Sequence, residues 1–337
     1  MSVGGVDARR PSLLGLQAVS AERMRELLTR SVGMIPHLGD RAATLDALAG
    51  RRVANVFLED STRTRLSFAT AAAKLGGGCV DLVEQGSSTS KGEGLVETCQ
   101  TVESMGVAAI VVRARQAGAA HLVAQHVACP VINAGDGRHE HPTQGLLDLL
   151  ALAEAQGRLD GFDLSGLRVA IVGDVNASRV ARSAIAGLTA LGARVTCVGP
   201  PALASDGLAS LSQIPLGVQI ERDLDAVLPA VDAVMMLRIQ FERHGPAGAI
   251  ASLRDYRARY ALTADRAAVM KQSAVVLHPG PMNPGVEIDL AVASSERSLI
   301  RRQVELGVAV RMAVLETLTE TTLTKQASTK QTMETRP

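Results

Sequence analysis

Residues 52–68 read RVANVFLEDSTRTRLSF. The first six residues are mostly apolar and partly β-branched, with little polar alternation, which is typical of a strand buried on both faces of a parallel sheet. Hydroxyl and guanidinium side chains follow at the point where a helix should begin, and helical spacing then continues from Leu66 to Leu75. The stretch therefore predicts a strand, a polar turn and a helix, which is the repeating unit of an α/β fold.

The same alternation recurs on both sides of this stretch. Further strands are predicted at 108–112, 130–133, 167–172, 194–198, 233–237 and 274–277, and further helices at 94–105, 145–155, 178–191 and 304–323. Strands that alternate with helices favour parallel sheets covered by helices. The strands form two groups, before and after about residue 143. We therefore predict two doubly wound α/β domains of similar size, joined by interdomain helices.

The length of the chain supports this division, because 337 residues are too many for one ordinary core. We expect residues 1–142 and 297–325 to form one domain and residues 143–296 to form the other. The last residues, 326–337, read QASTKQTMETRP and have no apolar face. A polar segment of this kind is predicted to be a disordered tail.

Composition excludes several classes of function. The formal net charge is +1, and aromatic residues make up only 2% of the chain. These values favour neither nucleic acid nor a membrane surface as a partner. The four cysteines contain no CxxC spacing, and the N-terminus lacks the apolar stretch of a signal peptide. Together these features predict a soluble, cytoplasmic protein with reduced thiols.

The polar turn at residues 59–65 is the first candidate site. A helix N-terminus presents free backbone N–H groups and a partial positive charge, which suit an anion. Ser61, Thr62, Arg63 and Thr64 would add donors that match a phosphate. The alternative is an ordinary helix cap with solvated arginines, but consecutive polar donors after a buried strand favour the anion site.

A second candidate site is the segment GDGRHEHPTQ, residues 135–144, which follows the predicted strand at 130–133. Open α/β sheets bind ligands at the carboxyl ends of their strands, where His141 and Gln144 should lie. A histidine there can stabilise a developing oxyanion, although a buried structural histidine remains an alternative. His139, Glu140 and His141 could also suggest a metal site. No distant third ligand stands out, so we expect no metal.

Other polar segments follow later strands. Arg113 ends the strand at 108–112, where it suits an anion, and a solvated charge is an equal alternative. Arg179 and Arg238 offer two guanidinium groups that suit two carboxylates. A dinucleotide fingerprint is absent, because the residues after the strand at 167–172 read GDVNAS. This argues against a dehydrogenase. The segment HPGPMN at 278–283 predicts a stiff turn, and the Ser-rich segment 87–93 reads by itself as a surface loop.

Together these segments resemble the aspartate/ornithine carbamoyltransferase family. STRTR at 61–65 and HPTQ at 141–144 look like the two motifs with which that family binds carbamoyl phosphate. The resemblance runs from Leu13 to about Leu318, with the motifs in family order and at near-family spacing. It implies that the carbamoyl group of carbamoyl phosphate is transferred to the amine of L-aspartate. The expected products are N-carbamoyl-L-aspartate and phosphate, in pyrimidine biosynthesis, and no cofactor is expected.

The resemblance also implies a role for each candidate residue. Arg63, Thr64, Arg113 and His141 are the expected catalytic residues. The expected ligands of the two substrates are Ser61, Thr62, Arg63, Thr64, Ser87, Lys91, Arg113, His141, Gln144, Arg179, Arg238, Gln240, Gly280 and Pro281. Ser87 and Lys91 are expected to enter a neighbouring subunit's site, which implies a homotrimer with shared active sites. That trimer could also belong to a larger assembly with regulatory or dihydroorotase-like chains. Glu59 and Arg243 resemble an interdomain pair.

Two alternatives within this resemblance stay open. One is a carbamoyltransferase for another amino acid such as ornithine, but that branch carries an HCLP-like turn where residues 278–281 read HPGP. The other is an inactive homologue that serves as a scaffold, although every expected phosphate ligand is retained. The sequence departs from the family pattern at Ala69, at 176–177 and at Pro284, where relatives often carry Arg. None of these departures removes a carbamoyl phosphate ligand.

Overall fold

The computed structural model describes residues 11–39, 44–83, 94–239 and 252–334, and the side chains as far as residue 320. The chain divides into two compact units of nearly equal size. Unit 1 contains the residues up to Val19, Glu26–Thr143 and the residues from Gly307 onward, and unit 2 contains Ser20–Arg25 and Gln144–Leu306. Three helices have residues in both units: α1 (Ala21–Met34), α6 (Pro142–Ala155) and α12 (Ile300–Glu334).

Unit 1 is built on a four-stranded parallel sheet with the strand order β2-β1-β3-β4. The strands are β1 (Arg52–Phe57), β2 (Gly78–Val83), β3 (Ala109–Ala114) and β4 (Val131–Asp136). The helices between them are α3 (Thr62–Lys74), α4 (Leu95–Ser104) and α5 (Ala119–His126), and a short α2 (Pro36–Gly39) precedes the sheet. Because β2 lies on one side of β1 and β3 on the other, the order of the strands reverses between β1 and β3.

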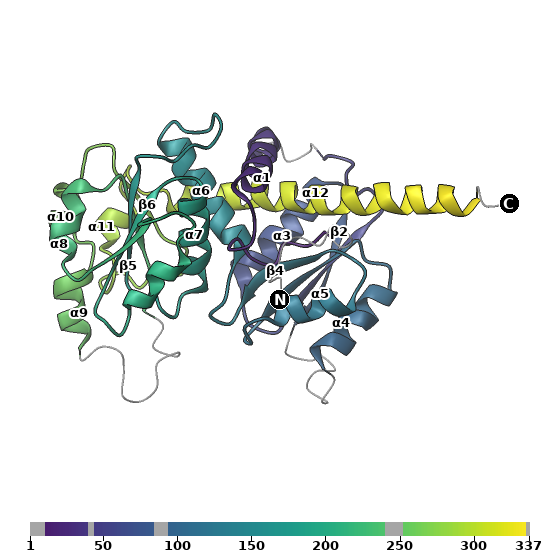
Figure 1. Cartoon of the computed structure of the whole chain (residues 1–337), viewed down its shortest axis with the longest axis horizontal. Helices are drawn as coiled ribbons and strands as arrows, with labels where there is room; N and C mark the ends of the chain where they lie inside the picture. The colour runs from purple at the N-terminus through teal and green to yellow at the C-terminus, as the bar shows by residue number, and fades with distance from the viewer. Residues whose placement is uncertain (1–10, 40–43, 84–93, 240–251, 335–337) are drawn as a thin grey trace. The chain divides into compact units, whose positions relative to one another are not determined.

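Helices cover both faces of this sheet (Figure 1). On one face, apolar residues of β1, β3 and β4 pack with α4 and α5 in a single core cluster. On the other face, Phe68 and Ala72 of α3 are completely buried. Arg311 of α12 lies over the ring of Phe68, with its guanidinium carbon 5.2 Å from the ring centroid, and donates to Ser67 Oγ at 3.0 Å. These contacts fix α3, and hence the turn at its N-terminus, against the sheet.

Unit 2 has a five-stranded parallel sheet with the order β7-β6-β5-β8-β9. Its strands are β5 (Arg168–Val172), β6 (Arg194–Val198), β7 (Val218–Glu221), β8 (Ala233–Met236) and β9 (Val275–Leu277). Its helices are α7 (Arg179–Ala190), α8 (Leu224–Val227), α9 (Leu253–Tyr260), α10 (Ala264–Ala268) and α11 (Leu290–Ala293), with 3₁₀ turns at Asp206–Leu211 and Leu228–Ala230. Figure 1 shows α7 on one side of β5 and β6, with α8 and α9 on the other. The order of the strands reverses between β5 and β8.

The predicted fold class, two doubly wound parallel-sheet domains of similar size joined by interdomain helices, is confirmed. Two strands escaped prediction. The first, β2, begins with glycine and contains Asp81, and the second, β7, alternates between apolar and polar residues. Both lie at the edge of a sheet, where burial on both faces is not required.

The boundaries of the two units differ in detail from the predicted domains. The structure divides the chain after Thr143 and after Leu306, whereas the sequence predicts divisions after 142 and 296. It also places Ser20–Arg25 in unit 2. The backbone of α12 continues to Glu334, into the stretch from 326 for which disorder is predicted, so the disorder of this tail stays a prediction. No helix in the described part of the chain is both long and apolar enough to cross a membrane.

Candidate active site

The reversal points of the two sheets identify where ligands should bind. In an open α/β sheet, a crevice forms outside the carboxyl ends of the two strands at which the strand order reverses. In unit 1 those strands are β1, which leads into the STRTR turn, and β3, which contains Arg113. In unit 2 they are β5, which leads to Arg179, and β8, which leads to Arg238. These predicted ligands therefore lie at the reversal point of each sheet, whereas His141 follows the edge strand β4 and Gly280 the edge strand β9.

The N-terminus of α3 has the features of an anion site. Ser61 is the N-cap residue, with φ −161° and ψ 92°, and within the described residues its hydroxyl makes no capping hydrogen bond. The backbone N–H groups of the first turn are thus not capped by this side chain, and this turn contains no acidic residue. Arg63 is exposed at this end, whereas Thr64 is buried.

The two arginines of the STRTR motif have different surroundings. Nε of Arg65 lies 3.6 Å from Oδ2 of Asp81 on β2, so this side chain is directed toward the edge strand. The other carboxylate oxygen of Asp81 accepts from Asn55 Nδ2 at 2.8 Å. Arg63 remains at the exposed N-terminus of the helix. Arg65 is thus a partner of Asp81, and the role of Arg63 as a phosphate ligand stays a prediction.

Arg113 is held firmly at the end of β3. It is 9% exposed, and its Nη1 donates to the carbonyl oxygen of Ala134 at 3.0 Å. Its Nη2 donates to Glu59 Oε1 at 2.9 Å and to the carbonyl oxygen of Asp60 at 3.5 Å. A guanidinium that bridges β4 and the turn after β1 is pre-organised, which is what stabilisation of a developing oxyanion requires. Glu59, predicted to form an interdomain pair with Arg243, here contacts Arg113.

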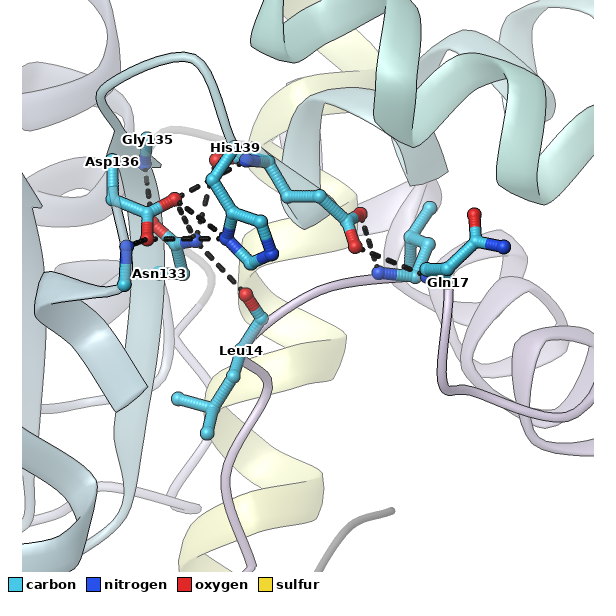
Figure 2. Close-up of polar contacts among 9 residues, drawn as sticks. Leu14, Gln17, Asn133, Gly135, Asp136 and His139 are labelled. Atoms are coloured by element: carbon cyan, nitrogen blue, oxygen red, sulfur yellow. Dashed lines mark hydrogen bonds and ion pairs between the residues drawn. The ribbon is translucent and has the colours of Figure 1, made fainter. Parts of the chain in front are cut away.

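The segment before His141 is organised by Asp136, the last residue of β4 (Figure 2). Its carboxylate accepts from the backbone N–H of Gly118 at 2.7 Å, from Asn133 Nδ2 at 2.8 Å and from the backbone N–H of Glu140 at 3.2 Å. Nδ1 of His139 lies 3.2 Å from both carboxylate oxygens. Burial by itself would raise the pKa of Asp136, but the hydrogen bonds from His139 and Asn133 outweigh it and lower that pKa.

Glu140 attaches this segment to the N-terminal part of the chain. Its carboxylate accepts from the backbone N–H of Leu16 at 2.6 Å and of Gln17 at 3.1 Å (Figure 2). A Cβ added to Gly15 would lie 2.3 Å from Oε1 of Glu140, so only glycine fits there without displacing the carboxylate. His141 follows this anchored residue and is 4% exposed. His139 contacts Asp136, whereas Glu140 contacts the backbone of Leu16 and Gln17.

Helix α6 begins directly after His141 and carries Gln144. Nε2 of Gln144 donates to Oδ1 of Asp148 one turn later, at 2.8 Å. Gln303 donates to the same oxygen at 2.7 Å. Asp148 is 3% exposed, so the side chain of Gln144 is oriented by a buried carboxylate.

In unit 2, a close approach of two strands positions the candidate carboxylate ligands. Gly173 follows β5 with φ 121°, and a Cβ there would lie 2.7 Å from the carbonyl oxygen of Leu237 after β8. Ser178 caps α7 by accepting from the N–H of Ala181 at 3.1 Å, and Arg179 is the first residue of the helix. Arg179 is 7% exposed, and Arg238 is partly buried.

The turn after β9 is fixed by a buried His–Glu pair. Nε2 of His278 lies 3.2 Å from Glu287 Oε1, and that oxygen also accepts from the N–H of Asn283 at 2.6 Å. Nδ1 of His278 accepts from the N–H of Gly280 at 2.8 Å, so Nε2 is the nitrogen that donates to Glu287. The Gly280–Pro281 peptide bond is cis. The backbone of the expected ligands Gly280 and Pro281 is thus defined by two hydrogen-bonded side chains.

Four predicted residues lie outside the described part of the chain: Ser87, Lys91, Gln240 and Arg243. The roles expected of them stay predictions. Sequence reasoning did not single out Asn133, Asp136 or Glu140 as organisers of the His141 segment. A buried acid at the end of a strand was visible in the sequence, but its partners come from distant parts of the chain.

Comparison with known proteins identifies the family to which this arrangement belongs. The aspartate/ornithine carbamoyltransferase carbamoyl-P binding domain matches residues 11–154, and the Asp/Orn binding domain of the same family matches residues 165–318. The chain belongs to the aspartate/ornithine carbamoyltransferase family. The predicted membership is confirmed, and the two matched regions correspond closely to the two groups of strands.

Individual carbamoyltransferases resemble the whole chain. An aspartate carbamoyltransferase catalytic subunit from Myxococcus xanthus is 49% identical over 307 residues, which cover 91% of this chain and 99% of that protein. The aspartate transcarbamoylase of Trypanosoma cruzi, solved in complex with N-(phosphonacetyl)-L-aspartic acid, has a TM-score of 0.82 and 30% identity, over 93% of this chain and 97% of that chain. The ornithine carbamoyltransferase of Thermus thermophilus has a TM-score of 0.77 at 24% identity, over 91% and 98% of the two chains, and shows the common fold alone.

Proposed function

We propose that this protein transfers the carbamoyl group of carbamoyl phosphate to the amine of L-aspartate, giving N-carbamoyl-L-aspartate and phosphate. The observation that carries the proposal is the group of ligands at the reversal point of unit 1. There, the N-terminus of α3 and the anchored guanidinium of Arg113 come together in a chain of this family. The relatives named for aspartate carbamoyltransferase support the choice of reaction.

Unit 1 supplies the groups that would hold carbamoyl phosphate. Its phosphate would accept hydrogen bonds from the N–H groups of the first turn of α3, from Ser61, Thr62 and Thr64, and from Arg63. Arg113, His141 and Thr64 would face the carbamoyl oxygen, which gains negative charge as the amine attacks. Gln144 would receive the carbamoyl amide. No covalent enzyme intermediate is required, because the positioned amine displaces phosphate through a tetrahedral species.

Unit 2 supplies the groups that would select the acceptor. Arg179 and Arg238 follow neighbouring strands and carry positive charge that matches the two carboxylates of aspartate. Ornithine carries a cationic side chain, which two arginines would repel. The backbone at Gly280 and Pro281 and the side chain of Gln240 would complete the aspartate site. We therefore assign the carbamoyl phosphate site to residues 1–142 with 297–325, and the aspartate site to 143–296.

The direct test measures carbamoyl aspartate by colorimetry with purified protein and carbamoyl phosphate. L-aspartate should be carbamoylated and L-ornithine should not. A bisubstrate analogue with a phosphonate and an aspartate moiety should inhibit much more tightly than aspartate binds, because it spans both sets of ligands. Preference for ornithine would overturn the assignment, and absence of both activities would favour the scaffold alternative.

The proposal extends to assembly. We expect a cytoplasmic homotrimer in which Ser87 and Lys91 of one subunit act in the site of its neighbour, because a head-to-tail contact closes into a ring. The trimer would act alone or in a larger assembly with regulatory or dihydroorotase-like chains.

This arrangement predicts complementation between two defective variants. Lys91→Ala would spoil the donated group and His141→Ala the receiving site, so each homotrimer should be nearly inactive. In a mixed trimer, about one site in three should combine both intact residues, by the geometry of the ring. The two variants are dissociated, mixed, reassembled and assayed. If hybrid trimers form without recovered activity, Lys91 does not act in trans.

A further inference from the structure

A second group of potential ligands lies in unit 1, beside the segment that precedes His141. It consists of His121 on α5, Asp136 at the end of β4 and His139 in the turn that follows. One ligand atom from each residue lies within 4.8 Å of the other two. We propose that these three residues form a binding site for a late first-row divalent metal ion, for which Zn²⁺ is the probe.

The distances fit coordination with a small adjustment. Zinc binds imidazole nitrogen and carboxylate oxygen at about 2.0–2.2 Å, so two ligands at a tetrahedral angle lie about 3.3–3.6 Å apart. Nδ1 of His139 and the carboxylate oxygens of Asp136 are already 3.2 Å apart. The widest separation in the group, at most 4.8 Å, exceeds the tetrahedral value by about 1.2–1.5 Å. Rotation of a histidine ring can close this gap, and the side chain of His139 is 38% exposed.

The carboxylate of Asp136 has an acceptor position that is available to coordinate a metal ion. Two carboxylate oxygens offer about four acceptor positions. Backbone N–H groups of Gly118 and Glu140 and the side chain of Asn133 use three of them. Nδ1 of His139 lies 3.2 Å from Oδ2, and Figure 2 shows the His139 ring beside the carboxylate of Asp136. If the proton of His139 moves to Nε2, its Nδ1 can coordinate an ion at that position while the three structural hydrogen bonds persist.

The hydrogen bond between Asp136 and His139 does not account for the position of His121, the third residue of the group. Its Nδ1 is buried and has no hydrogen-bond partner among the described residues. Its ring packs edge-on against that of His139, with the centroids 5.4 Å apart. A buried imidazole nitrogen without a hydrogen-bond partner is costly, and coordination of a metal ion would satisfy it.

The set of ligands indicates the class of ion. Two imidazoles and one carboxylate suit Zn²⁺, Co²⁺, Ni²⁺ or Cu²⁺ better than Mg²⁺ or Ca²⁺, which prefer oxygen ligands. The hydrogen bonds of Asp136 to Gly118 and Asn133 would serve as its outer contacts. A bound ion would join α5 to the turn that leads to His141. It would stabilise the position of that turn and is not required as a reactant in carbamoyl transfer.

The test is titration of chelator-treated, untagged protein with Zn²⁺ in a buffer without phosphate, by calorimetry and by metal analysis after dialysis. Wild-type protein should bind one Zn²⁺ per chain with a Kd below about 10 μM. His121→Gln should weaken binding by at least about 10- to 100-fold, the range found even for loss of an outer-shell partner. His126→Gln is the matched control, because His126 lies on the same helix, is exposed and contacts the carbonyl oxygen of Leu122. It should bind as the wild type does.

A second measurement keeps the proposal testable if His121→Gln folds poorly. Wild-type protein saturated with Co²⁺ should show two strongly shifted, exchangeable imidazole N–H signals in its proton NMR spectrum, one from each histidine. His139→Gln, at a partly exposed position, should remove one of them. Three results would each overturn the proposal: a wild-type Kd above about 10 μM, equal losses in His121→Gln and His126→Gln, or no shifted imidazole signals.

Discussion

Replacing Arg63 by alanine tests whether the N-terminus of α3 is a phosphate site. Arg63 is exposed at that end of the helix, beside the N-cap residue Ser61 and the first-turn N–H groups. A guanidinium that contacts the phosphate should gain interaction energy as the leaving group gains charge. Deletion of a comparable donor costs about 2.7–4 kcal/mol of transition-state stabilisation. We therefore expect a loss of at least about 2 kcal/mol, which corresponds to a roughly 30-fold fall in kcat/KM.

The same motif provides the control. Arg65→Ala removes a neighbouring arginine of the same charge, but Arg65 lies 3.6 Å from Asp81, and the two side chains are 32% and 43% exposed. An exposed ion pair of this kind contributes about 0–1 kcal/mol to stability, so this variant should fold and keep most of its activity. Both variants are assayed over a range of carbamoyl phosphate concentrations, with urea unfolding to measure stability. Near-normal kcat/KM for Arg63→Ala, or an equal loss for Arg65→Ala, would refute the assignment of phosphate to Arg63.

Three further predictions concern the second unit and the thiols. Pro284→Arg introduces the residue that the family resemblance leads us to expect and should lower the KM for aspartate; unchanged kinetics would mean that this turn is compensated elsewhere. Gly173→Ala should lower the free energy of unfolding by about 1–3 kcal/mol, because φ is 121° and the new Cβ would lie 2.7 Å from the carbonyl oxygen of Leu237. Gly33→Ala, where a Cβ meets nothing within 4 Å, is its control in the same urea titration, and equal effects would contradict this reasoning. Burial raises the pKa of Cys79 to about 11 and those of Cys99 and Cys197 to about 12, so native protein at pH 8 should react slowly with a thiol reagent and denatured protein rapidly. Fast labelling of the native protein would contradict it.

The fold was predictable because the composition of its central strands reflects their burial on both faces of the sheet. Strands β1, β3 and β5 are nearly continuous apolar runs, as a sheet covered on both faces requires. The edge strands β2 and β7 are less buried and contain exposed residues, and their mixed composition gave no comparable signal. Helix α3 begins at Thr62, in the polar turn where a helix start is predicted, although the helical spacing is visible in the sequence only from Leu66.

The candidate ligands were predictable, but the residues that position them were not. Arg113 lies at the end of β3, and Ser61 and His141 lie in the segments after β1 and β4, so their place at the carboxyl edge of a sheet follows from chain order. Glu140 acts on Leu16 and Gln17, at separations of 124 and 123 residues, and such a contact depends on the tertiary fold. His121 was missed for the same reason, since it approaches Asp136 from another element.

The topology suggests how this family could keep carbamoyl phosphate as the carbamoyl donor and vary the amino acid that accepts the carbamoyl group. In unit 1, Glu59 after β1 and Arg113 in β3 are 54 residues apart in sequence, yet they meet because the strand order reverses between their strands. The same rule joins the ends of β5 and β8 in unit 2. The donor and acceptor ligands that we propose thus follow strands of separate sheets, and the family's second domain is described for both aspartate and ornithine. On this proposal, a change of acceptor would require changes only at the loops after β5, β8 and β9, while the STRTR turn, Arg113 and the Asp136 network remain as they are.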